Sequence, residues 1–394
     1  MANTTELAAP EPGGPPALRL FRLFGIQFTA NWSWMLLVGL LVYVAASMFR
    51  GLLPGSSQEV VWSLAALAAL LSVVSLYAHE LAHALVARRF GIPVRTISLF
   101  LLGGIAHITR ESPTPRAEFL IALAGPITSL GIGVLGVGVG LAAGGPAPPV
   151  GVLGLWVAVT NVPLAVFNLV PAYPLDGGRV LRAVLWFAAQ DVKWGSTVSA
   201  RVGQVAALSL LFAGVYVLFE GATNALSGLW LMMIAWFMYA GAVSAQHAAL
   251  VSDALRRLTV AAVMDRHYGH VQAGLSVRAF AEQRLVDTTR AANGEPAARS
   301  YAVYRDERLV GLLSLRRLGR IPVHAWGQTA IERATIPIDR APSLEPGAPA
   351  LGALQLLVEE GCEQVAVMAE GRLLGLVTRD DLARAATSPA PAGR

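Results

Sequence analysis

The sequence predicts a membrane protein of the all-α class, with about six transmembrane helices followed by a soluble α/β region. Of the 394 residues, 55% are hydrophobic and only 14% are charged, whereas soluble domains carry about 25% charged residues. The mean hydropathy of +0.56 reflects long apolar runs between about residues 30 and 246. This composition excludes a disordered chain, a fibrous repeat and a single soluble globule.

Six apolar runs are long enough to cross about 30 Å of hydrocarbon as helices. They cover residues 30–49, 60–87, 118–143, 151–170, 202–219 and 224–246. Residues 180–190 are expected to form a short amphipathic helix at the membrane interface. The Ala- and Pro-rich ends, 1–18 and 387–394, are expected to be disordered. The membrane domain is therefore placed at 19–250.

The basic residues predict the orientation of the spans. Arginines gather after the second span, between the fourth and fifth spans, and after the sixth span. Because such loops stay in the cytoplasm, we expect a multi-pass protein of the cell (inner) membrane with both termini cytoplasmic. The net charge of +5 and the pI near 9.7 therefore do not indicate a nucleic-acid partner. The single cysteine, Cys362, excludes an internal disulfide and a cysteine-rich zinc site.

The second span ends with an H-E-x-x-H motif formed by His79, Glu80 and His83. Residues four apart lie on one helix face, so both imidazoles can bind one zinc ion. Glu80 stands beside the first ligand and can accept a proton from an attacking water. Ionisable residues inside a membrane helix are costly and usually mark function. The alternative is a satisfied polar patch near the helix end.

A third metal ligand must come from another segment, because catalytic zinc takes three protein ligands. Asp176 follows the fourth span in a Pro- and Gly-rich break, where irregular backbone is tolerated if it lines a cavity. The aspartate could instead cap the helix that follows. Glu118, His107 and Glu111 are rival ligands that also follow the second span.

Four motifs together resemble the site-2 protease family of intramembrane zinc metalloproteases. They are HELAH (79–83), LLGGIAHI (101–108), ALAGP (122–126) and NLVPAYPLDGGR (168–179). The resemblance covers about residues 30–250. It implies a zinc ion held by His79, His83 and Asp176, with Glu80 as the catalytic base.

The resemblance also implies further site residues. Asn168 matches an asparagine that lies beside the active site and helps to hold the substrate or the oxyanion. Gly103 and Gly104 match a short extended edge, with which an unwound substrate could pair. The family's substrates are membrane proteins, such as membrane-tethered transcription regulators or anti-sigma factors. Regulated intramembrane proteolysis in the lipid bilayer is therefore the expected activity.

The soluble region contains an internal repeat. Residues 302–318 align with residues 366–382 at an offset of 64, and seven of the seventeen positions are identical. Each copy reads as strand, turn, strand and the start of a helix. The pair resembles tandem cystathionine-β-synthase-like (CBS) domains, which we place at 251–322 and 323–386.

The CBS resemblance implies adenine nucleotide (ATP, ADP or AMP) as a regulatory ligand. Thr378 and Asp381 match the residues that contact such a ligand, whereas the first copy has Ser314 followed by Arg317 in the place of the aspartate. One competent cleft is therefore expected. The alternative is a degenerate pair that serves only to form a homodimer.

Three classes of function remain open at this point. The first is an intramembrane zinc metalloendopeptidase whose activity responds to the CBS pair. The second is a CBS-gated transporter or channel, which would require polar residues in several spans, whereas they cluster only at the second span and at the 168–176 break. The third is a non-catalytic zinc-binding scaffold, which the presence of Glu80 disfavours.

Overall fold

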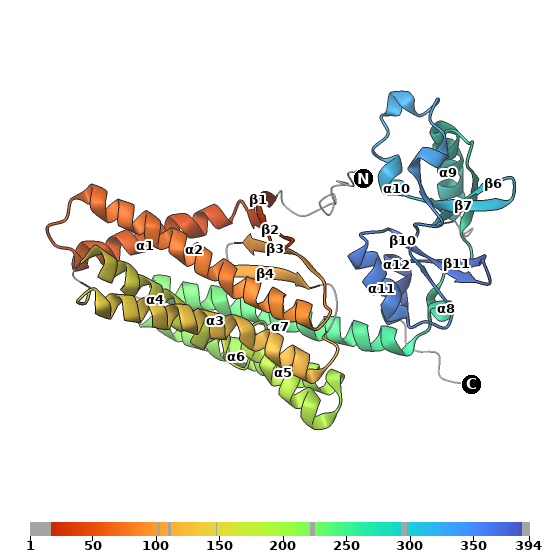
Figure 1. The fold of residues 1–394 in the computed structure, drawn as a ribbon. Coiled ribbons are helices and arrows are strands. Elements are labelled where there is room, and N and C mark those ends of the chain that lie inside the picture. The colour runs from red at the N-terminus through yellow and green to blue at the C-terminus, as the bar shows by residue number, and fades with distance from the viewer. Residues whose placement is uncertain are drawn as a thin grey trace. The chain divides into compact units, whose positions relative to one another are not determined.

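The chain divides into two compact units, Met1–Ala249 and Leu250–Arg394 (Figure 1). The computed structural model describes residues 17–100, 103–108, 112–146, 148–220, 225–292, 298 and 300–387. The predicted disordered ends lie almost entirely outside these residues, although the first strand already begins at Ala17.

Six helices in the described part of the chain are long and apolar enough to cross a membrane. They are α1 (Trp34–Leu52), α2 (Gln58–Arg89), α3 (Pro115–Ala142), α4 (Pro149–Asn168), α6 (Val192–Phe219) and α7 (Ala225–Arg257). Each overlaps one predicted span, so the six-span membrane fold is confirmed. The short helix α5 (Asp176–Ala189) begins four residues before the predicted amphipathic segment.

The first unit also contains a four-stranded sheet, of which only the extended segment at Gly103 and Gly104 was expected. Its strands are β1 (Ala17–Leu23), β2 (Ile26–Asn31), β3 (Val94–Phe100) and β4 (Gly103–Ile108), in the order β1-β2-β3-β4. β2 and β3 run parallel, and the outer pairs are antiparallel. Alternate residues on one face, such as Phe28 and Leu99, are buried in a core shared with Tyr77 of α2.

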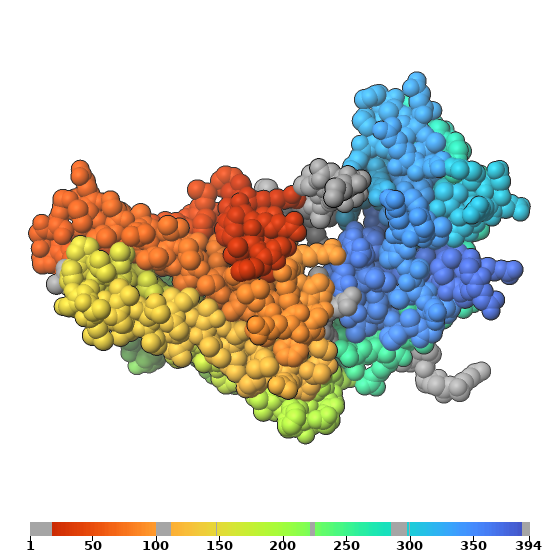
Figure 2. All heavy atoms as spheres, in the orientation of Figure 1, coloured from red at the N-terminus to blue at the C-terminus, as the bar shows by residue number. Residues whose placement is uncertain are grey.

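Small residues allow the helices of this unit to approach closely, as is common in membranes. A Cβ atom on Gly136 of α3 would lie 2.7 Å from the carbonyl oxygen of Gly154 of α4, and the reverse distance is also 2.7 Å. Phe49 of α1 packs edge-on against Trp156 of α4. Figure 2 shows the side chains of α1 to α4, in red to yellow, forming one continuous surface.

The second unit repeats one order of elements, β-α-β-β-α. The first copy contains β5 (Gly269–Gln272), α9 (Val277–Ala292), β6 (Tyr301–Arg305), β7 (Arg308–Leu313) and α10 (Leu315–Leu318). The second contains β9 (Ser343–Leu344), α11 (Ala350–Glu359), β10 (Gln364–Ala369), β11 (Arg372–Thr378) and α12 (Arg379–Thr387). In each copy the first strand pairs parallel to the second, and the last two form an antiparallel hairpin.

The two copies exchange flanking segments. Helix α8 (Val260–Val263) precedes the first copy but packs on the second, and Asp265 exchanges two backbone hydrogen bonds with Leu376 of β11. The short helix η2 (Ile331–Ala334) and strand β8 (Thr335–Pro337) follow the first copy and complete its sheet beside β7. The predicted boundary at 322 therefore separates β8 from the sheet to which it belongs.

Cys362 lies half-buried at the edge of the second copy's core. Burial raises the pKa of its thiol to about 11. The thiol is therefore protonated at neutral pH, as expected for a packing residue rather than a reactive one.

The close α3–α4 contact can be tested with two matched substitutions on α3. Gly136→Ala should destabilise the membrane unit by about 1–3 kcal/mol, because the added methyl group meets the backbone of α4. Gly138→Ala is the control, since a Cβ atom there meets nothing within 4 Å. Thermal unfolding in detergent should show a lower midpoint for Gly136→Ala only, and equal midpoints for both variants would contradict this packing.

Candidate metal centre

Helix α2 brings two histidines to the same buried site. The helix starts at the capping residue Ser57, whose side chain accepts a hydrogen bond from the Val60 amide. His79 and His83 follow on one face near its other end, and they are only 3% and 4% exposed. This burial inside the helix bundle removes both imidazoles from solvent.

Helix α5 supplies the third side chain. Asp176 is its first residue, and its side chain is 13% exposed. The break that precedes α5 folds tightly on the helix start, because a Cβ atom on Gly177 would lie 2.3 Å from the carbonyl oxygen of Leu169. The Ser199 hydroxyl of α6 donates a hydrogen bond to the Gly178 carbonyl and fixes this helix start from the other side.

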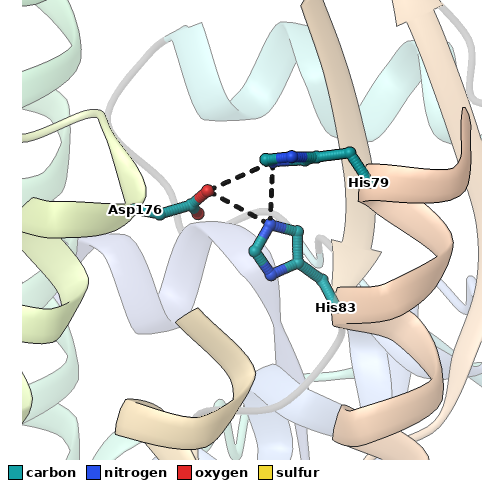
Figure 3. A group of neighbouring side chains, drawn as sticks. All are labelled: His79, His83 and Asp176. Carbon is teal, nitrogen blue, oxygen red and sulfur yellow. Dashed lines mark hydrogen bonds and ion pairs between the residues drawn. The ribbon is translucent and has the colours of Figure 1, made fainter. Parts of the chain in front are cut away.

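The three side chains converge in an equilateral triangle (Figure 3). The Nε2 atoms of His79 and His83 lie 3.2 Å apart, and each lies 3.2 Å from Oδ2 of Asp176. Ligands of tetrahedral zinc at about 2.0–2.1 Å from the metal are separated by roughly 3.3 Å. The triangle therefore has the size that a zinc ion requires.

The outer nitrogens of both imidazoles have partners on α3. His83 Nδ1 lies 2.6 Å from the carbonyl oxygen of Ile121, which can only accept, so this nitrogen carries the proton. His79 Nδ1 lies 2.9 Å from the Ser129 hydroxyl. In the neutral His83 ring the Nε2 lone pair then faces Asp176. Acceptor atoms that point at one position repel one another, and a cation bound between them removes this repulsion.

Helix α3 also leaves room for that cation at Gly125. A methyl group at this position would lie 2.2 Å from His83 Nε2 and 2.5 Å from His79 Nε2. Any side chain would therefore occupy the space where the ligand atoms converge. The donor atoms and the space beside them both fit a metal ion.

The remaining predicted site residues of the membrane unit lie in three places. Glu80 is 9% exposed, and its carboxylate interacts electrostatically with His83, His79, Asp176 and Arg179. Asn168 is the half-buried last residue of α4, eight residues before Asp176, and no hydrogen bond joins its side chain to another described residue. Gly103 and Gly104 begin β4, which stands at one end of the strand order and packs near α2.

The rival ligands do not join the cluster of His79, His83 and Asp176. Glu118 is buried, but its oxygens contact Arg179, Arg182 and Ser112 instead. Glu111 lies outside the described residues, and so does the side chain of His107.

Sequence reasoning missed the supporting role of α3. Its residues Glu118, Ile121, Gly125 and Ser129 recur at helical spacing and share one face. Ser129, Ile121 and Gly125 contact or face the two histidines. Glu118 contacts Arg179, which lies on the same helix as Asp176. The spacing of small and polar residues in the third span was the available signal, and one of these positions, Gly125, lies in the ALAGP motif (122–126).

Thr378 and Asp381 meet each other at the start of α12 in the second unit. The Thr378 hydroxyl donates to Oδ2 of Asp381 at 2.6 Å, and the Thr378 amide donates to the same oxygen at 2.9 Å. Arg384 pairs with the other carboxylate oxygen. This arrangement caps the helix, and Asp381 is only 5% exposed. In the first copy the Ser314 hydroxyl accepts from the Arg317 amide at α10.

Comparison with known families matches both units. The model of peptidase family M50 matches residues 65–153 and 148–213, which contain the three converging side chains. The model of the CBS domain matches residues 334–388, which contain the second copy of the repeat. The predicted CBS resemblance of the soluble region is therefore confirmed, as is the resemblance to the zinc proteases.

The sequence similarity to known proteins covers most of the chain. Rip3 of Mycobacterium tuberculosis, a zinc metalloprotease by its name, is 32% identical over 93% of this chain and 92% of its own length. The Synechocystis protein sll0528, also named as a zinc metalloprotease, is 33% identical over 80% of each chain. The solved site-2 protease of Methanocaldococcus jannaschii is 27% identical, with a TM-score of 0.39 over 59% of this chain and 95% of that chain.

The space at Gly125 can be tested directly. Gly125→Ala should weaken zinc binding by at least about tenfold, because the methyl group collides with both Nε2 atoms, whose rings are held at Nδ1. The control is Gly131→Ala on the same helix, where a Cβ atom meets nothing within 4 Å. Zinc affinity is measured on purified protein by competition with a chelator. Wild-type affinity in Gly125→Ala would show that the metal binds elsewhere.

Proposed function

Because the chain belongs to peptidase family M50, we propose that it is an intramembrane zinc metalloprotease that hydrolyses peptide bonds in or near the transmembrane segments of membrane proteins. The observation that carries the proposal is the triangle of His79, His83 and Asp176, together with the buried Glu80, which follows His79 on α2. A metal site alone would also suit a scaffold. A buried carboxylate next to it supplies the proton acceptor that hydrolysis requires.

His79, His83 and Asp176 would hold the zinc ion. When bound, zinc supplies Lewis acidity, which polarises a peptide carbonyl and favours deprotonation of water. Glu80 accepts the proton of the attacking water and delivers it to the leaving amide nitrogen. The carboxamide of Asn168 donates a hydrogen bond to the oxygen on which negative charge develops. This role is compatible with the position of Asn168 at the end of α4, where the chain leaves the helix.

The strand β4 supports the second step of the proposal, the binding of an unwound substrate. A helical peptide bond is shielded, so a transmembrane substrate must become extended before cleavage. Gly103 and Gly104 begin an antiparallel strand at the end of the sheet, and β3 is its only partner among the described strands. A substrate segment can add to that edge through backbone hydrogen bonds.

The cellular setting is proposed from the charge pattern. The arginine distribution supports cytoplasmic termini and, with them, a cytoplasmic soluble unit. The substrate would be a protein of the same inner membrane, such as a membrane-tethered transcription regulator or an anti-sigma factor. The family's substrates support this class and leave the individual protein to be identified by experiment.

The proposed base can be tested by Glu80→Gln. This variant should lose about 10²-fold or more of the hydrolytic activity, because the carboxamide cannot accept the proton. Zinc should remain bound, since Glu80 is not one of the three converging side chains. Glu59→Gln is the control, because Glu59 is an exposed acid in the first turn of the same helix.

The natural substrate would be found by comparing membrane proteomes of cells that carry the wild-type chain or Glu80→Gln. Intact substrate should accumulate in the variant, and its cleavage can then be reconstituted with purified protein. Cleavage that survives Glu80→Gln would refute the proposed mechanism. Transport activity that survives His79→Ala would favour a transporter instead.

We further propose that the CBS pair binds adenine nucleotide and adjusts protease activity. The match of the CBS model to residues 334–388 and the repeated β-α-β-β-α order support a paired module. Thr378 and Asp381 are the proposed contacts in the second copy. Because Asp381 is engaged in the helix cap, a nucleotide hydroxyl would share or replace the bonds that the cap now makes.

Calorimetric titration with ATP, ADP and AMP tests this regulation. Asp381→Asn should weaken binding by at least about tenfold, because a charged acceptor is lost. The control is Asp380→Asn, which changes the exposed neighbouring acid. Protease activity is measured over the same nucleotide concentrations. In the wild type it should change only with those nucleotides that bind. No binding to the wild-type chain would leave association into a homodimer as the module's role.

A further inference from the structure

We propose that Glu118 is a positioning residue, whose carboxylate holds the start of α5 so that Asp176 faces the two histidines. This inference rests on the proposed zinc protease function. It concerns an acid that the sequence left among the rival metal ligands and that the proposed mechanism does not use. Its role is to orient the third ligand through Arg179 and Arg182.

The carboxylate of Glu118 lies at the centre of a buried polar cluster between α3 and α5. Its Oε1 accepts a hydrogen bond from Arg179 Nε at 3.1 Å, and its Oε2 lies 3.5 Å from Arg179 Nη2. Arg182 Nη1 lies 3.9 Å from Oε1. The Ser112 hydroxyl donates to Oε2. Both oxygens therefore have partners, which explains why Glu118 does not turn toward the metal centre.

Arg179 connects the proposed ligand with Arg182 along α5. Arg179 is three residues after Asp176, and Arg182 is three residues after Arg179, so Arg179 neighbours both side chains on the helix surface. The side of α5 that carries the arginines packs against α3. Fixing Arg179 to Glu118 therefore fixes the rotation of the first turn of α5, and with it the direction of Asp176.

The burial of this cluster makes the pairing of Glu118 with the two arginines costly to break. The Glu118 side chain is 2% exposed, and those of Arg179 and Arg182 are 23% and 17% exposed. A buried charge that loses its partner keeps its desolvation cost, so the arginines would seek other acceptors if Glu118 became neutral. Asp176 is one such acceptor, because it lies three residues before Arg179 on the same helix. Such a shift would turn the aspartate away from the histidines.

The test measures zinc affinity by chelator competition on the full-length protein in detergent. Glu118→Gln should weaken zinc binding about 10- to 100-fold, the range seen when residues that orient metal ligands are changed. The same substitution is then made in an Asp176→Ala background. There it should have no further effect, because the ligand that Glu118 orients is absent.

Replacement of zinc by Co²⁺ gives a second readout that overall stability does not move. The visible absorption bands of Co²⁺ report the arrangement of its ligands, and Glu118→Gln should shift them toward those of Asp176→Ala. Ser112→Ala is the milder variant, since it keeps every charge and removes one hydrogen bond to Glu118. It should weaken zinc binding in the same direction by a smaller factor, and it serves if Glu118→Gln does not fold.

The outcomes separate this inference from the proposed function. Failure of the wild-type chain to bind zinc at His79, His83 and Asp176 would refute the proposed metalloprotease. Wild-type binding with unchanged affinity in Glu118→Gln and Ser112→Ala would refute the positioning role alone. An equal loss of affinity in the wild-type and Asp176→Ala backgrounds would also refute it, because Glu118 would then act without Asp176.

Discussion

The structure of the membrane unit depends on one constraint: ionisable side chains placed inside a helix bundle must have partners there. His79 and His83 satisfy this on α3, through the Ser129 hydroxyl and the Ile121 carbonyl oxygen. These partners use the outer nitrogen of each ring and leave the inner nitrogens to face Asp176. For His83, whose Nδ1 faces a carbonyl oxygen, the need for a buried partner therefore also sets the tautomer that a metal ligand needs. The same constraint explains why Glu118 pairs with Arg179.

Close helix packing makes these short contacts attainable. α3 approaches α4 at Gly136 and Gly154, and it approaches the histidines at Gly125. In each place the missing side chain lets polar or backbone atoms come within contact distance. Gly125, Gly136 and Gly154 thus support the site, because larger residues at these positions would separate the helices that carry its donors and acceptors.

The sequence predicts the spans and the histidine pair, since both depend on local patterns, whereas Asp176 was separated from its rivals only by the resemblance to the site-2 protease family. An apolar run of about 20 residues and an i, i+4 histidine pair are visible without tertiary information. The sheet of β1 and β2 was missed because β2 pairs with β3, more than 60 residues away. Ile121 was missed because it contributes a backbone carbonyl, which no side-chain pattern reveals. The partner of Glu118 could not be chosen because it depends on how α5 packs against α3.

All parts of the proposed metal centre depend on one face of α3. Glu118 holds α5, and Ile121 orients His83. Gly125 leaves space for a cation, and Ser129 contacts His79. A shift of α3 by one residue would rotate this face by about 100° and disrupt all four contacts together. α3 also meets α4, the helix that ends at Asn168, through the close approach of Gly136 and Gly154. The helices that carry the proposed ligands and the proposed oxyanion donor therefore all contact α3.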